Sequence, residues 1–253
     1  MLFYQASLPV SSATLRFVAG VIRTHHRVAG TRWRVLDPGR QALLTLVYLR
    51  KGDTYADLAP GFGVSVATVY RRVNETIDLL ASRAEPLPEV LRRARRAGYA
   101  FVIVDGTLIH TDRLAADRPY YSGKDRCHGM NVQVITDPTG SLLWTSGALP
   151  GSVHDTAAAR IWPIPAHLHQ ARLAALGDKG YTGLDEHVVA TPWRGRNKPE
   201  PKKAYNRLHA RLRAPGERAF AQLKTWRILR KLRCCPQRAT NITRAITILN
   251  QTG

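Results

Sequence analysis

The spacing of apolar positions predicts a helical first third of the chain. Between Ser11 and about Leu80 apolar residues recur with helical periodicity, most clearly over residues 41–49. A short helix over residues 54–59, a glycine-containing turn over residues 60–63 and a second helix opened by Ser65 form a helix-turn-helix pattern. In this second helix we expect Val66 and Val69 to face the core. The alternative interpretation is an ordinary helical hairpin.

Strands dominate the pattern that follows. Five apolar residues over 100–104, mostly β-branched or aromatic, are typical of a strand buried on both faces, and the run stops at Asp105 and Gly106. Two further strands are expected over residues 130–136 and 141–148. The turn signal over residues 137–140 between them predicts an antiparallel meander. A helix should follow over residues 152–161, begun either by Ser152 or by the His154-Asp155 pair.

The last part of the chain returns to helices. A short apolar run precedes Asp178, a fifth strand is expected over residues 188–191, and residues 203–248 are mostly helical with interruptions at 215–216 and 234–236. The proline-containing stretch 85–88 separates the two patterns. The sequence therefore predicts an α/β fold with two domains: a helical domain over residues 1–90 with the helix-turn-helix, and an α/β domain over residues 98–253.

Charge indicates the partner. The 253 residues contain 38 Lys and Arg against 18 Asp and Glu, a net charge of +20, and fifteen of the basic residues lie between residues 194 and 238. Such a concentrated excess favours a polyanion, most simply nucleic acid. The exposed positions of the second helix are then candidates for DNA contact: Ser65, Ala67, Thr68, Arg71 and Arg72. Three cysteines without metal-binding spacing, and no long apolar segment, lead us to expect a cytoplasmic protein without a membrane partner.

Two carboxylates at strand ends are the first candidates for chemistry. If the strands before Asp105 and Asp178 are neighbours, the two carboxylates meet at one edge of the sheet and repel unless a cation lies between them. Carboxylate oxygens suit Mg²⁺ or Mn²⁺. A third acid, Glu217, follows Pro215 in the first turn of a predicted helix. The simpler alternatives are a turn role for Asp105 and a helix ion pair of Glu217 with Arg213 or Lys224.

Several motifs together resemble one family. Residues 104–107 (VDGT), 151–155 (GSVHD), 176–181 (LGDKGY) and 213–217 (RAPGE), with Lys224, are similar to DDE transposases of bacterial insertion sequences. The insertion-sequence-five group and its Harbinger-like eukaryotic relatives match best. The resemblance runs from about Tyr99 to the C-terminus, and the preceding helix-turn-helix suits the same family.

The resemblance implies an RNase H-like mixed sheet flanked by helices, with two divalent ions, Mg²⁺ or Mn²⁺, bound by Asp105, Asp178 and Glu217. It also implies that the protein binds double-stranded DNA at the terminal inverted repeats of its element, cleaves it there and joins the freed ends to target DNA. A homo-oligomer is expected because two ends are processed together.

Other residues match the family around these acids. We expect His154, Asp155 and Arg213 to support the metal-binding carboxylates, and Lys124 and Lys224 to contact DNA. Arg213, Glu217 and Lys224 have the spacing of a family signature, but Ala210 replaces its tyrosine. Two alternatives remain: an inactive or domesticated DNA-binding protein, and a metal-dependent endonuclease of the same fold that does not transfer strands.

Overall fold

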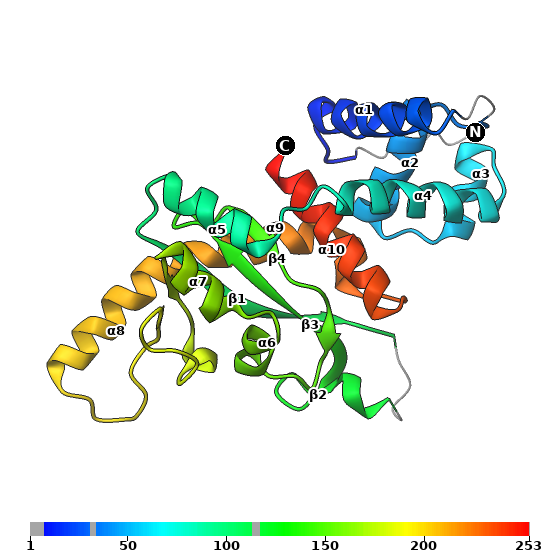
Figure 1. Cartoon of the computed structure of the whole chain (residues 1–253). Coiled ribbons are helices and arrows are strands. Elements are labelled where there is room, and N and C mark those ends of the chain that lie inside the picture. The colour runs from blue at the N-terminus through cyan, green and yellow to red at the C-terminus, as the bar shows by residue number, and fades with distance from the viewer. Residues whose placement is uncertain (1–7, 31–33, 113–116, 253) are drawn as a thin grey trace.

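A computed structural model describes residues 8–30, 34–112 and 117–252. Figure 1 shows a group of N-terminal helices beside a sheet that is flanked by further helices. The helices of the first group begin at side chains that cap free backbone amides, among them Ser11, Asp37, Thr54 and Ser65. They are α1 (Ser12–Val28), α2 (Pro38–Lys51), α3 (Tyr55–Phe62) and α4 (Val66–Ala81).

The predicted helix-turn-helix is α3 and α4. Gly63 ends α3 in the left-handed conformation (φ 66°), and the Ser65 hydroxyl accepts a hydrogen bond from the Thr68 amide at 3.2 Å. Val69 is buried, as predicted. The prediction for Val66 was wrong, because this first residue of α4 precedes the inward stripe that starts at Val69 and is 48% exposed.

The sheet has the strand order β2-β3-β1-β6-β7, with β4 and β5 also paired to β3. β3 runs antiparallel to β1, whereas β6 runs parallel to β1 and β7 parallel to β6. This is the mixed sheet flanked by helices that we expected. The strands are β1 (Phe101–His110), β2 (Tyr121–Ser122), β3 (Cys127–Thr136), β4 (Leu142–Thr145), β5 (Leu149–Pro150), β6 (Ala174–Leu176) and β7 (Val189–Ala190).

One strand boundary differs from the prediction. β1 does not end at Asp105 but continues to His110, because β3 pairs with it along its whole second half, from Asp105 opposite Val134 to His110 opposite Gly129. Asp105 therefore lies in the middle of a strand, where its backbone is paired with β3. The turn over residues 137–140 was predicted correctly: the Gly140 amide donates to the Asp137 carbonyl at 3.0 Å.

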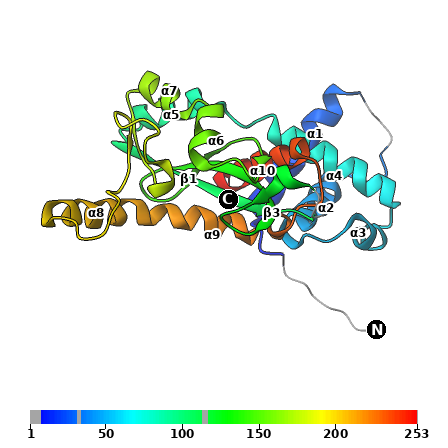
Figure 2. The same ribbon diagram turned by 90° about the horizontal axis from the view of Figure 1, so that it is seen from below.

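Helices cover both faces of the sheet (Figures 1 and 2). On one face Val102, Val104 and Ile135 pack in a cluster with α5 (Leu87–Arg96), α6 (Asp155–Ile161) and α7 (Ile164–Ala171). On the other side lie α8 (Glu200–Arg213), α9 (Glu217–Thr225) and α10 (Pro236–Gln251). The predicted interruption at residues 215–216 is real, since a 3-10 turn over Ala214–Gly216 separates α8 from α9.

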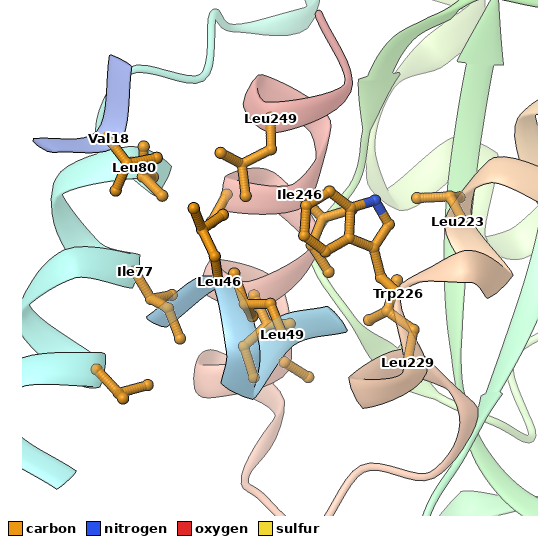
Figure 3. Close-up of a cluster of buried hydrophobic side chains, with 14 of the residues drawn as sticks. Val18, Leu46, Leu49, Ile77, Leu80, Leu223, Trp226, Leu229, Ile246 and Leu249 are labelled. Carbon is orange, nitrogen blue, oxygen red and sulfur yellow. The ribbon is translucent and has the colours of Figure 1, made fainter. Parts of the chain in front are cut away.

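The N-terminal helices share a core with the C-terminal helix. One buried cluster joins Val18, Leu46 and Ile77 to Ile246 and Leu249 of α10, and to the α10 side of the sheet (Figure 3). Trp226 lies in the same cluster. Its indole nitrogen donates to Asn250 at 2.9 Å, and the guanidinium of Arg50 lies 3.5 Å from its ring centroid. α2 and α4 therefore pack directly on elements from the other end of the chain.

A partly buried carboxylate ties the N-terminal helices together. Glu75 of α4 accepts hydrogen bonds from Arg34 at 2.7 Å, Gln41 at 2.8 Å and Arg72 at 3.1 Å. Burial raises the pKa of the Glu75 carboxyl, but these hydrogen bonds outweigh burial and hold the pKa at about 2. Because the folded-state pKa is depressed, this stabilisation is present above the unfolded pKa near 4.5 and is lost as the pH falls toward 2.

We expect Glu75→Gln to lower the free energy of unfolding at pH 7 by roughly 2–3 kcal/mol. Below pH 4.5 the difference between parent and variant should shrink, which denaturant titrations at several pH values would measure. Glu89→Gln is the matched control, because Glu89 pairs with Arg92 on the surface, and the loss of such a pair costs less than about 1 kcal/mol. Equal losses in both variants would contradict the structural role of Glu75.

No helix among the described residues is both long and apolar enough to cross a membrane.

Candidate active site

The parallel pairing of β1 and β6 brings Asp105 and Asp178 together. Ile103 lies opposite Leu176, so the same register continued by two residues places Asp105 beside Asp178. Asp178 directly follows the end of β6 and begins a 3-10 turn, and its carboxylate accepts a hydrogen bond from the Gly180 amide at 2.7 Å. The condition on which the two carboxylates were expected to meet, that their strands are neighbours, is thus fulfilled.

A third carboxylate, from Asp155, reaches the same place. Asp155 is the first residue of α6, and its carboxylate lies over the backbone of Gly106: a Cβ atom there would be 2.0 Å from Asp155 Oδ1. A Cβ atom on Gly180 would be 2.8 Å from Asp178 Oδ1 and 3.2 Å from Asp155 Oδ2. Gly106 and Gly180 therefore leave the room that the Asp155 carboxylate occupies.

Buried amide groups hold Asp155 in position. Asn131 Nδ2 donates to Asp155 Oδ1 at 3.0 Å and to the Val153 carbonyl at 3.0 Å. Gln133 Nε2 donates to Asn131 Oδ1 at 2.8 Å and to Asp155 at 3.4 Å, while its carbonyl oxygen accepts from the Tyr181 hydroxyl at 2.6 Å. Because Asn131, Gln133 and Tyr181 are all buried, this network fixes the start of α6 against β3.

Our sequence reasoning missed this network. Asn131 and Gln133 are two polar residues at alternate positions of an otherwise apolar strand, so they face the same side of the sheet. A pair of amides in a buried strand requires polar partners, and that signal could have pointed to Asp155.

The electrostatics of Asp105 show an excess of negative charge. The pKa of the Asp105 carboxyl is raised to about 6, because burial and the nearby Asp178 and Asp155 carboxylates together outweigh the lowering by the Arg213 guanidinium. Burial also raises the pKa of the Tyr181 phenol well above its usual value, and the same three acids add to the effect. The site therefore favours a bound cation.

Arg213 is the cation that Asp105 contacts in this structure. Its guanidinium nitrogen lies 2.9 Å from Asp105 Oδ2, with both side chains about one-fifth exposed. Arg213 is the last residue of α8, and the following turn packs on β1 through Gly216, where a Cβ atom would be 2.9 Å from Ile103 Cγ2. The helix break at Pro215 thus places Arg213 on the first acid.

Glu217 is the third acid that we predicted for the site. It lies in the first turn of α9, as predicted, and its side chain is exposed. Among the described residues its carboxylate has no hydrogen-bond or ion-pair partner, and Glu217 is not one of the main charges that act on Asp105. Asp178 and Asp155 are therefore the acids that act most strongly on Asp105.

The predicted DNA-contacting residues lie at two places. Lys124 Nζ is 3.6 Å from Asp155 Oδ2, beside the acids, and Lys224 is exposed near the end of α9. In α4, Ser65 and Thr68 use their hydroxyls at the helix start and Arg72 pairs with Glu75, which leaves Arg71 as the exposed cation. His154 precedes α6 at the N-cap position with an exposed side chain that caps no amide.

The donor set suits a hard divalent ion. Three carboxylates, one of them with a raised pKa, offer the oxygen ligands that Mg²⁺ and Mn²⁺ prefer. In the described part of the chain no three acidic, His or Cys side chains are already gathered around one point. Asp105 is paired with the Arg213 guanidinium in this arrangement.

Comparison with known families settles where this geometry belongs. Residues 104–251 match the DDE superfamily endonuclease family, and residues 34–86 match the helix-turn-helix of DDE superfamily endonucleases. The chain belongs to the DDE superfamily endonucleases. The resemblance that the motifs indicated is confirmed, as is the helix-turn-helix. Enzymes of this superfamily use divalent metal ions, in agreement with the carboxylate cluster.

Individual relatives of this DDE endonuclease include a bacterial and a vertebrate protein. The chain is 32% identical over 197 residues to the "Putative transposase for insertion sequence element IS112" of Streptomyces albus G, a match that covers 76% of the chain and 71% of the relative. It is 24% identical over 180 residues to the "Putative nuclease HARBI1" of Xenopus laevis, which covers 64% of the chain and 49% of that protein. In the crystal structure of the Mos1 strand transfer complex, a chain that is 14% identical aligns with a TM-score of 0.24, covering 83% of this chain and 84% of that one. This score is too low to establish a shared fold.

Proposed function

We propose that this DDE endonuclease is a transposase that binds the ends of its element, cleaves DNA there with the help of divalent metal ions and joins the freed strands to target DNA. The observation that carries the proposal is the pairing of β1 with β6, which sets Asp105 beside Asp178 in a family of DNA endonucleases. The relative named as an insertion-sequence transposase favours strand transfer over simple hydrolysis.

Asp105 and Asp178 are the proposed metal-binding pair, with Glu217 as the third acid and two Mg²⁺ or Mn²⁺ ions as the expected complement. Bound metal ions would activate the attacking oxygen and stabilise the leaving oxygen at phosphorus. Asp155 joins this group as a further acid, since its carboxylate lies beside Asp178 at Gly180. Arg213 balances the charge of Asp105 until an ion takes its place. The side-chain amides of Asn131 and Gln133 donate hydrogen bonds to the Asp155 carboxylate and hold it in position.

DNA recognition is assigned to the helix-turn-helix. Arg71 on the exposed side of α4 is the best-placed cation for a contact with the duplex, with Ser65 and Thr68 at the helix start nearest to the base edges. Lys124 and Lys224 are proposed to contact phosphates. A homo-oligomer is proposed because two element ends must be cut and joined together.

A cleavage assay tests the function. Purified full-length protein should cut a labelled duplex carrying the inverted repeat that flanks its reading frame, in Mg²⁺ or Mn²⁺ but not in EDTA, and should join the cut end to a plasmid. No cleavage with either ion would contradict the proposal and leave a DNA-binding protein without catalysis. Cleavage without joined product would favour the second candidate, a nuclease, a function that the name of the vertebrate relative suggests.

A further inference from the structure

A projecting basic segment lies next to the acids. Residues 192–212, here called the basic arm, comprise the loop after β7 and most of α8. The arm contains seven Lys and Arg residues and one acid, Glu200. Figures 1 and 2 both show α8 extending away from the body of the molecule. His209 is the one buried residue of α8, so nearly all of the helix surface is open to solvent.

The arm is a built structure and not a loose charged tail. The Asn206 side chain accepts from the Trp193 amide at 2.8 Å and donates to the Trp193 carbonyl at 3.1 Å, which ties the loop to the helix. The Lys202 ammonium lies 4.1 Å from the centroid of the Trp193 ring. The loop and α8 therefore form one unit.

Both ends of the arm are attached to the active site. Arg194 donates to the Thr182 hydroxyl at 3.1 Å and to the Lys179 carbonyl, in the turn that begins with Asp178. At the other end α8 finishes with Arg213 on Asp105. A polyanion lying along the arm would consequently reach the carboxylates at the end where α8 meets Asp105.

The positive charge of the arm has almost no internal partner. Glu200 is shared by Lys203 and Arg207, at 3.9 Å and 2.6 Å. Among the described residues Arg196 and Arg211 have no acidic partner, and both are exposed. A cluster of fixed cations without counter-charges attracts the phosphates of DNA and releases counterions on binding.

We infer that the basic arm binds the phosphate backbone of the duplex that lies across the active site. The 14 residues of α8 span about 20 Å, long enough to follow several successive phosphates. That this duplex is the one being cut rests on the proposed function; the binding of DNA to the arm does not.

This contact is distinct from that of the helix-turn-helix. In both views α8 lies at the opposite end of the molecule from α3 and α4, with the sheet between them. DNA held by α4 and DNA held by the arm are therefore separate segments, or one segment that passes along the whole molecule.

A second copy of the chain is the competing occupant. Tyr205, Leu208 and Leu212 form an exposed apolar stripe at helical spacing on α8. Two copies meeting through this stripe would bring two strongly basic helices together, and like charges disfavour such a contact. DNA is favoured because it neutralises the same charges.

The test uses the full-length chain and a 30-base-pair duplex of random sequence, in buffer with EDTA, so that catalysis plays no part. The arm variant carries Arg196→Gln, Lys203→Gln and Arg211→Gln. The control carries Arg92→Gln, Arg95→Gln and Arg96→Gln on α5, which removes the same charge from another exposed basic helix. Fluorescence anisotropy at several salt concentrations gives the dissociation constant and its salt dependence.

We expect the arm variant to bind the duplex at least about tenfold more weakly than the parent. The slope of the logarithm of its binding constant against the logarithm of the salt concentration should fall in magnitude by roughly 2–3, whereas the slope of the control should fall by less than about 1. Equal losses in both variants would overturn the inference, because only the overall charge would then matter. Leu208→Gln with Leu212→Gln should leave the mass measured by light scattering unchanged. If the variant with Leu208→Gln and Leu212→Gln has half the mass of the parent, and the arm variant binds DNA as tightly as the parent, the apolar stripe is an interface between copies instead. The anisotropy measurement is made without catalysis, so its outcome does not depend on whether the protein cleaves the inverted-repeat duplex.

Discussion

Asp105→Asn is expected to reduce metal-dependent cleavage by roughly 10³-fold or more. The amide keeps the shape of the side chain but removes the negative charge that lies beside Asp178, and a lost contribution of about 4 kcal/mol to the transition state corresponds to this factor. The substitution also removes the ion pair with Arg213, so the fold should be checked by circular dichroism and thermal unfolding. The rate would be measured on the inverted-repeat duplex under single-turnover conditions.

Asp112→Asn provides the control for this loss. Asp112 lies two residues beyond β1 and pairs on the surface with Lys231 at 3.1 Å and Arg233 at 3.3 Å, so the same change of charge occurs away from the acids. Its cleavage rate should stay within about twofold of the parent, since surface pairs contribute little. If Asp105→Asn cleaves like the control, the proposed metal-binding pair is wrong.

Gly106→Ala should cause the second large loss. The new methyl group would lie 2.0 Å from Asp155 Oδ1 and 3.0 Å from Gln133 Nε2, so the carboxylate would have to leave its place above β1. We expect a destabilisation of about 1–3 kcal/mol from overpacking and at least tenfold weaker binding of Mn²⁺. Calorimetric titration with Mn²⁺ and thermal unfolding measure the two effects separately.

Gly20→Ala is the matched control, because Gly20 lies within α1 and a Cβ atom there would have no neighbour within 4 Å. It should stabilise the protein by up to about 1 kcal/mol through helix propensity and leave Mn²⁺ binding unchanged. Unchanged Mn²⁺ binding in Gly106→Ala would mean that Asp155 does not contribute to the ion site.

The sheet was predictable because its signals are local. Apolar runs, the turn over residues 137–140 and the acids after two of the runs were all visible in the sequence, whereas the pairing of the strands before Asp105 and Asp178 entered only as a condition that the structure fulfils. The extension of β1 to His110 was missed, since residues 106–110 become a strand only through their pairing with β3.

Only part of the environment of Asp155 could be predicted. The family motif placed it among the supporting residues, but an acid at the start of a helix is usually explained by capping. Its position beside the other acids depends on the missing side chains of Gly106 and Gly180, which come from two other parts of the chain. The ion pair of Arg213 with Asp105 is likewise a tertiary contact that spacing along the chain does not determine.

The packing of α4 against α10 also bears on whether the N-terminal helices could be used apart from the rest of the chain. The hydrophobic surface of these helices is completed by residues 239–249 of α10. A fragment that carries α1 to α4 without α10 would expose this surface to water and should be prone to aggregate. The helix-turn-helix of this chain is therefore not a module that can be transplanted alone.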